Sequence, residues 1–129
     1  FLNPVSEADI SSLAGTWTAA IMQFSDPTGT YPAYDMIADG GSFSLTVDAS
    51  GNFDVSITPP GGSADTDSGT ITVVGDMLKI YSSGDLSTTA AQYVLVDANT
   101  LQIRSNDESH DFSGDGTDEP AVMYLALSK

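Results

Sequence analysis

Two adjacent segments with strictly alternating side chains constrain the fold of this chain more than any other feature. Apolar residues occupy every second position from residue 43 to 47 and again from 53 to 57, with hydroxyl or acidic residues between them. The linker Ala49-Ser50-Gly51-Asn52 has the composition of a turn. A period of two with one apolar face is typical of antiparallel strands that cover a core on one side. We therefore predict a β-hairpin whose inward residues are Phe43, Leu45, Val47, Phe53, Val55 and Ile57 and whose outward residues include Asp54, Ser56 and Thr58.

Similar segments recur along the chain, and helical periodicity is absent after residue 14. We predict eight strands that start near residues 15, 42, 53, 69, 77, 91, 101 and 120. Short turns such as Gly75-Asp76 join most of them, and a meander of eight strands loses its exposed edges when it closes on itself. We expect residues 1–129 to form a single all-β domain, an eight-stranded antiparallel up-and-down barrel, with a sandwich as the competing arrangement.

The start of the chain predicts a short helix that leads into the first strand. Ser6-Glu7-Ala8-Asp9 has the form of a capping box, so we expect one or two helical turns after it. The next segment, Leu13-Ala14-Gly15-Thr16-Trp17, contains the only tryptophan. We expect Trp17 to plug one end of the barrel, and Gly15 to let the chain pass close to the barrel floor. Simple alternation along the first strand places Trp17, Ala19 and Ile21 on one face and Ala20, Met22 and Phe24 on the other.

These segments together resemble the small bacterial lipocalin-like domains. The shared pattern is the Gly-Thr-Trp opening, then a segment like Phe43 to Phe53, then Gly69-Thr70-Ile71 leading through Gly75-Asp76 to Leu78-Lys79-Ile80. The resemblance covers most of the chain and implies a barrel that holds a small hydrophobic or amphipathic molecule at its open end. It also implies that a late-strand arginine stacks on the opening tryptophan, and Arg104 is the only arginine here.

The charge balance excludes several kinds of partner. Asp and Glu outnumber Lys and Arg by 18 to 3, which gives a net charge of −15. Nucleic acid and anionic membrane surfaces would be repelled, so we expect neither as a partner. The absence of cysteine excludes disulfides, thiolate metal sites and a cysteine nucleophile. An Asp-rich, Lys-poor chain rich in Ser, Thr and Gly suggests a secreted or periplasmic protein, and nothing in the sequence indicates an oligomeric state.

The segment from Ser25 to Gly41 is too long for an ordinary hairpin turn, and such loops are usually functional or disordered. In lipocalins the corresponding loop lies over the open end as a lid. We predict a binding site for a small hydrophobic molecule at this end, where the candidate ligand-binding residues are Tyr31, Tyr34, Met36, Tyr93 and Met123. The alternative is that the loop side chains only cover the end of a barrel filled by its own core.

The acidic segment from residue 110 to 119 has the spacing of a calcium loop. Side-chain oxygens at the first, third and fifth positions, a backbone carbonyl at the seventh and glycine at the sixth are what such a loop uses. The candidate metal ligands are Asp111, Ser113, Asp115, the carbonyl of Thr117, and Glu119. An EF-hand is excluded because the twelfth position is Val122. Calcium is the one cofactor that the sequence suggests, and the alternative is a solvated acidic loop.

Few residues are available for catalysis. His110 is the sole histidine, and its neighbours in Ser109-His110-Asp111 cannot converge on it as a triad. We therefore predict a non-enzymatic binding protein of lipocalin-like type. One alternative is a calcium-dependent carbohydrate-binding or adhesive module in which Tyr31, Tyr34 and Tyr81 stack on sugars. A third is a barrel enzyme with a tyrosine and an aspartate as acid and base.

Overall fold

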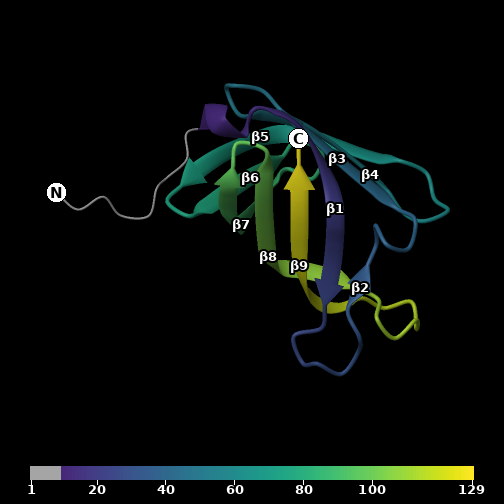
Figure 1. Ribbon diagram of the computed structural model, residues 1–129. Helices are drawn as coiled ribbons and strands as arrows, with labels where there is room; N and C mark the ends of the chain where they lie inside the picture. Colours follow the sequence, from purple (N-terminus) through teal and green to yellow (C-terminus); the bar gives the residue numbers. More distant parts are fainter. Residues whose placement is uncertain (1–9) are drawn as a thin grey trace.

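Neighbouring strands of the protein pair in chain order, and the last strand closes onto the first. The computed structural model describes residues 10–129, with the side chain of Asp107 left aside (Figure 1). The capping box predicted at residues 6–9 lies outside this range. The elements are η1 (Ile10–Leu13), β1 (Gly15–Ser25), β2 (Tyr34–Asp35), β3 (Ser42–Val47), β4 (Asn52–Thr58), β5 (Asp65–Val74), β6 (Met77–Ser82), β7 (Ser87–Asp97), β8 (Thr100–His110) and β9 (Glu119–Ser128).

The sheet order is β1-β3-β4-β5-β6-β7-β8-β9, all neighbours are antiparallel, and β9 also pairs with β1. The predicted eight-stranded antiparallel barrel is therefore confirmed. The two residues of β2 form an added pairing beside the far end of β1, inside the segment predicted as a loop. Within residues 10–129 the only helical element is four residues long, and no helix there could cross a bilayer.

Two strands start earlier than predicted, because β5 begins at Asp65 and β7 begins at Ser87. The strand β8 is also long and continues to His110. The added residues are mostly polar, so they lack the apolar alternation on which the prediction depended. They are strands because their backbones complete the ladder with a neighbour, as when residues 65–66 of β5 pair with 56–57 of β4.

The two ends of the barrel differ. One end, which we call the Trp17 end, carries η1, the start of β1, the end of β9 and the short turns at 48–51, 75–76 and 98–99. The other, which we call the loop end, carries the loops at 26–41, 59–64, 83–86 and 111–118. Figure 1 shows the loop after β1 and the loop before β9 close to each other at this loop end.

Trp17 fills the Trp17 end, as predicted. Its side chain is fully buried, and its indole N–H donates a hydrogen bond of 2.8 Å to the carbonyl of Leu13. The cation beside the indole is the ammonium of Lys129, 4.7 Å from the ring centroid. The prediction that Arg104 stacks there is wrong, because Arg104 lies on the outer face between buried Ile103 and Ser105.

Gly15 makes the close approach that the sequence suggested. A Cβ atom at this position would lie 3.0 Å from Cε of Lys129, and the backbone φ is +128°. Glycine therefore lets the chain enter β1 beside the last residue of the barrel.

The first strand departs from simple alternation. A register shift between Ala19 and Ile21, where β1 pairs with β9, inserts one residue and reverses the facing of those that follow. Met22 and Phe24 therefore join Trp17 in the core, whereas Ile21 is 36% exposed. The predicted grouping of Ile21 with Trp17 is wrong for this reason.

Candidate functional site

A cavity of about 340 Å³ lies inside the barrel and reaches the loop end. Its walls are inward-facing residues of β3 to β9, and it opens where the lining residues Asp85 and Ser87 are exposed. Most of the lining is aliphatic or aromatic. The polar lining residues are Asp67, Ser82, Asp85, Ser87, Thr89, Ser105 and Glu108.

The polar lining residues lie on four adjacent strands and the turn between two of them, and each strand becomes apolar with depth. From the loop end inward, the inward positions are Asp67, Gly69 and Ile71 on β5; Ser82, Ile80 and Leu78 on β6; Ser87, Thr89 and Ala91 on β7; and Glu108, Ser105 and Ile103 on β8. The opposite wall supplies apolar groups, including Phe43, Phe53 and Met123. The cavity therefore has an apolar interior and a polar mouth.

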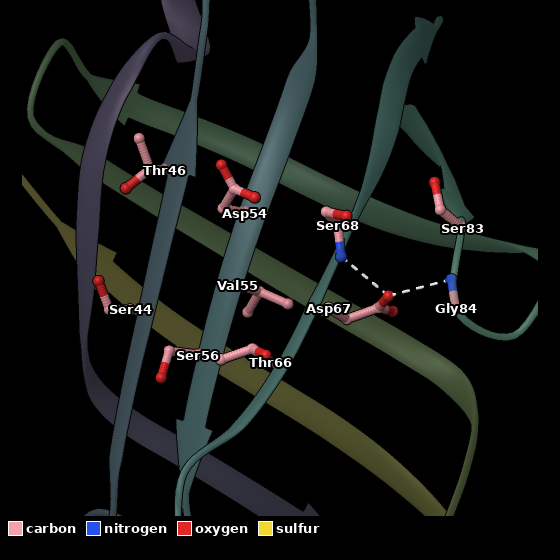
Figure 2. Close-up of a pocket in the computed structure, with 10 residues that line it drawn as sticks. All are labelled: Ser44, Thr46, Asp54, Val55, Ser56, Thr66, Asp67, Ser68, Ser83 and Gly84. Carbon is pink, nitrogen blue, oxygen red and sulfur yellow. Dashed lines mark hydrogen bonds between the residues drawn. The ribbon is translucent and has the colours of Figure 1, made fainter.

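Asp67 is held in a fixed position at the mouth. Its carboxylate accepts hydrogen bonds from the hydroxyl of Ser82 and from the backbone N–H groups of Ser68 at 2.8 Å and Gly84 at 3.3 Å. Figure 2 shows the carboxylate lying between these two N–H groups. The hydroxyl of Ser82, followed by the backbone donors, holds the pKa of Asp67 below its usual value. Asp67 is therefore an anion at neutral pH.

Glu108 reaches the cavity because β8 is irregular. The pairing of β8 with β9 shifts register between Ser105 and Glu108, so both residues face inward although they are three apart. Ser105 is only 2% exposed, and its hydroxyl donates a hydrogen bond of 3.1 Å to the Glu108 carboxylate. The strand predicted to start near residue 69 leaves Asp67 outside it, and no local signal in the sequence reveals a bulge like the one that turns Glu108 inward.

An aromatic cluster joins the two long loops of the loop end. The ring of His110 stacks on Phe24 at 5.3 Å and on Tyr34 at 4.8 Å between centroids. Phe112 meets His110 edge-on and stacks on Tyr31 at 6.1 Å. Contacts between aromatic side chains therefore connect the two long loops at the loop end.

The candidate ligand-binding residues are distributed over different places. Met123 lines the cavity. Tyr31 and Tyr34 belong to the aromatic cluster, and Met36 is buried in the core with 6% exposure. Tyr93 is buried toward the Trp17 end, where its hydroxyl donates to the carbonyl of Gly75 at 3.3 Å.

The acidic loop brings three of the candidate metal ligands together. Carboxylate oxygens of Asp111, Asp115 and Glu119 lie within 4.8 Å of one another. Backbone N–H groups already engage them, as when Gly114 and Gly116 each donate to Asp111 at 2.9 Å. The Gly116 N–H is the main cause that lowers the pKa of Asp111.

The other two candidate ligands also contact this cluster. The hydroxyl of Ser113 donates to Asp111 at 3.4 Å, and the N–H of Thr117 donates to Asp115 at 2.9 Å. The carboxylate of Glu119 accepts from the N–H groups of Phe112 at 2.8 Å and Ser113 at 3.0 Å. These hydrogen bonds fold the loop back on itself.

A second depression, of about 550 Å³, lies on the outer face of β3, β4 and β5 (Figure 2). Hydroxyl side chains that alternate outward, together with Asp54, dominate its lining, and Asp67 at the cavity mouth also borders it. The prediction that Asp54 faces water is confirmed. No aromatic residue of the described part of the chain is in this lining. Tyr81, a candidate for sugar stacking, lies on the outer face of β6 at 38% exposure.

Comparison with known proteins bears on the architecture. No protein-family model and no curated protein matches the chain. An uncharacterized protein from Bacteroides eggerthii has a similar structure, at 12% identity and a TM-score of 0.52, over 90% of this chain and 98% of that one. A redesigned β-barrel is similar at 14% identity and a TM-score of 0.50, over 94% of each chain. The likeness shows the fold alone.

Proposed function

We propose that this protein is a lipocalin-like, non-enzymatic binding protein that holds a small amphipathic molecule in the barrel cavity. The observation that supports the proposal is the change from an apolar interior to a polar mouth along β5 to β8. A ligand with an apolar body and a polar end matches both environments. Its body would pack against groups such as Phe53 and Met123, and its polar end would lie among the hydroxyls of Ser87 and Thr89.

The size of the cavity limits the ligand. About 340 Å³ is near the lower end of the range for small-molecule sites, roughly 300–1,000 Å³. Burial of apolar ligand surface contributes about 0.8 kcal/mol for each methylene group. A chain or ring system of modest length therefore suits this cavity better than a long lipid.

Titration with N-phenyl-1-naphthylamine, a neutral apolar fluorophore that brightens when it leaves water, tests the proposal. Thr89 and Thr88 are adjacent on β7, and the first lines the cavity while the second is exposed. We expect Thr89→Trp to fill the mouth and weaken binding at least about tenfold, and Thr88→Trp to leave it unchanged. Thermal unfolding checks that both variants fold. Equal binding by the two variants, or no binding by the unaltered protein, would contradict the proposal.

We also propose that the acidic loop takes calcium, with a structural role. Three carboxylates within 4.8 Å of one another, and the calcium-loop spacing of their sequence, support it. Millimolar calcium should raise the free energy of unfolding by about 1 kcal/mol if the affinity is that of an extracellular calcium module. Asp115→Asn should abolish the effect, and the matched Asp118→Asn, just outside the cluster, should retain it. A melting temperature that is equal in calcium and in chelator would reject the site.

A further inference from the structure

The charged groups that line the barrel cavity are all acidic. They are Asp67 on β5, Asp85 in the turn between β6 and β7, and Glu108 on β8. Among residues 10–129, no lysine, arginine or histidine lines this cavity. The apolar cavity therefore ends at a mouth with carboxylates on three separate elements.

The basic residues of the chain lie elsewhere. Lys79 and Arg104 are exposed, on strand positions that alternate with buried inward residues, so they point outward. Lys129 lies over Trp17 at the opposite end of the barrel. His110 is stacked between Phe24 and Tyr34. None of these four basic residues is among the lining residues of the cavity.

From this arrangement we infer that the ligand is a cationic amphiphile, an ammonium group attached to a small apolar body. The inference depends on the proposed binding function and specifies its ligand class. An anionic head, such as a carboxylate or phosphate, would meet like charges at the mouth and be repelled. An ammonium group would instead donate hydrogen bonds to carboxylates and hydroxyls while its apolar body fills the interior.

The fixed geometry of Asp67 favours this ligand. Its hydrogen bonds from Ser82, Ser68 and Gly84 orient the carboxylate before any ligand arrives, so little reorganisation accompanies binding. The hydroxyl of Ser105 likewise orients Glu108. The net charge of −15 also draws cations toward the protein. That general attraction acts at every surface, so a test must separate it from recognition at the mouth.

Three probes that share one apolar chain make this separation: octylammonium, octan-1-ol and octanoate, each used to displace N-phenyl-1-naphthylamine at neutral pH. We expect octylammonium to bind about tenfold more tightly than octanol, and octanoate to bind weakest. The preference should shrink when salt is raised, because the mouth is partly open to solvent.

Matched variants locate the effect. Asp85→Asn alters an exposed turn residue, and Asp67→Asn alters the ordered carboxylate; each should reduce the preference for octylammonium over octanol at least about twofold. Asp54→Asn makes the same change in net charge on the outer face and should leave the preference intact. Asp85→Asn keeps the test valid if Asp67→Asn fails to fold.

The outcomes distinguish the two claims. If all three octyl probes bind with equal affinity, or if Asp54→Asn acts like Asp85→Asn, recognition of a cation is overturned while the binding function stands. If no octyl probe displaces the fluorophore, or the fluorophore itself does not bind, the cavity is not a binding site and both claims fail.

Discussion

The two ends of this barrel differ in how their interior is packed. At the Trp17 end the largest side chain of the protein is completely buried, its only polar atom has a partner, and short turns join the strands. At the loop end β5 to β8 become polar on their inner face, the connections at 26–41 and 111–118 are long, and a cavity opens. Packed side chains therefore close one end of the barrel, whereas the other end keeps a cavity.

This difference indicates which end of the barrel mainly provides stability and which end is suited to binding. Side chains leave a volume of about 340 Å³ inside the barrel, so the cavity walls make fewer packing contacts than the walls of a filled core would, and this is a cost to the fold. The closed barrel ladder and the core around Trp17 offset that cost. We therefore expect substitutions at the Trp17 end to act mainly on stability, and those at the loop end to act mainly on binding.

The substitution expected to change the free energy of unfolding most is Trp17→Ala. It removes a fully buried ring and leaves the Leu13 carbonyl without its donor, which should lower the free energy of unfolding by about 3–5 kcal/mol. The matched change at the loop end is Tyr31→Ala, whose ring is 37% exposed and should contribute less than about 1 kcal/mol. Urea unfolding measures both. Equal losses would remove the distinction between the two ends.

The Trp17 end was also the more predictable from sequence. Strict alternation and glycine-containing turns identified the inward residues of the hairpin formed by β3 and β4, since apolar side chains at a period of two have only one way to face a core. The plug at Trp17 followed from one large side chain placed after a glycine. Where the local residue pattern and the packing favour the same structure, the fold can be predicted from the sequence.

The candidate cavity was harder to predict, for physical reasons. Its mouth is lined by Asp67 and Glu108, whose polarity made their strands resemble loops. Two bulges, after Ala19 on β1 and after Ser105 on β8, reverse which residues face inward, and they depend on pairing with β9. The identity of the cation over Trp17 likewise depended on the position of the residue that follows β9, and Lys129 rather than Arg104 lies beside the indole.

Acidification is expected to lower the free energy of unfolding by a smaller amount. Asp26, Asp67 and Asp111 at the loop end have pKa values below the usual one, because N–H and O–H groups donate to their carboxylates. The stabilisation is present above the pKa of the unfolded chain, about 4, and is lost as pH falls through the lower folded-state values. At the Trp17 end the pKa of Asp48 is also lowered, chiefly by Asn52.

Because more of these carboxylates lie at the loop end, we expect that end to loosen first between about pH 5 and pH 2. The amide resonances of Gly84 and Gly116, which donate to Asp67 and Asp111, report on the loop end. The fluorescence of Trp17 reports on the other end. Simultaneous changes in both signals would mean that the two ends unfold as one unit.

The smallest change in the free energy of unfolding is expected from removing the cation that lies over Trp17. Lys129→Met keeps an unbranched side chain of similar length but removes the ammonium 4.7 Å from the indole centroid, and should lower the free energy of unfolding by about 0.5–1 kcal/mol. Arg104→Met removes a cation from the outer face and should change it by less than about 0.5 kcal/mol. Urea unfolding of both variants at low and high salt measures the difference. A larger loss from Arg104→Met would show that Arg104, and not Lys129, stabilises the Trp17 end.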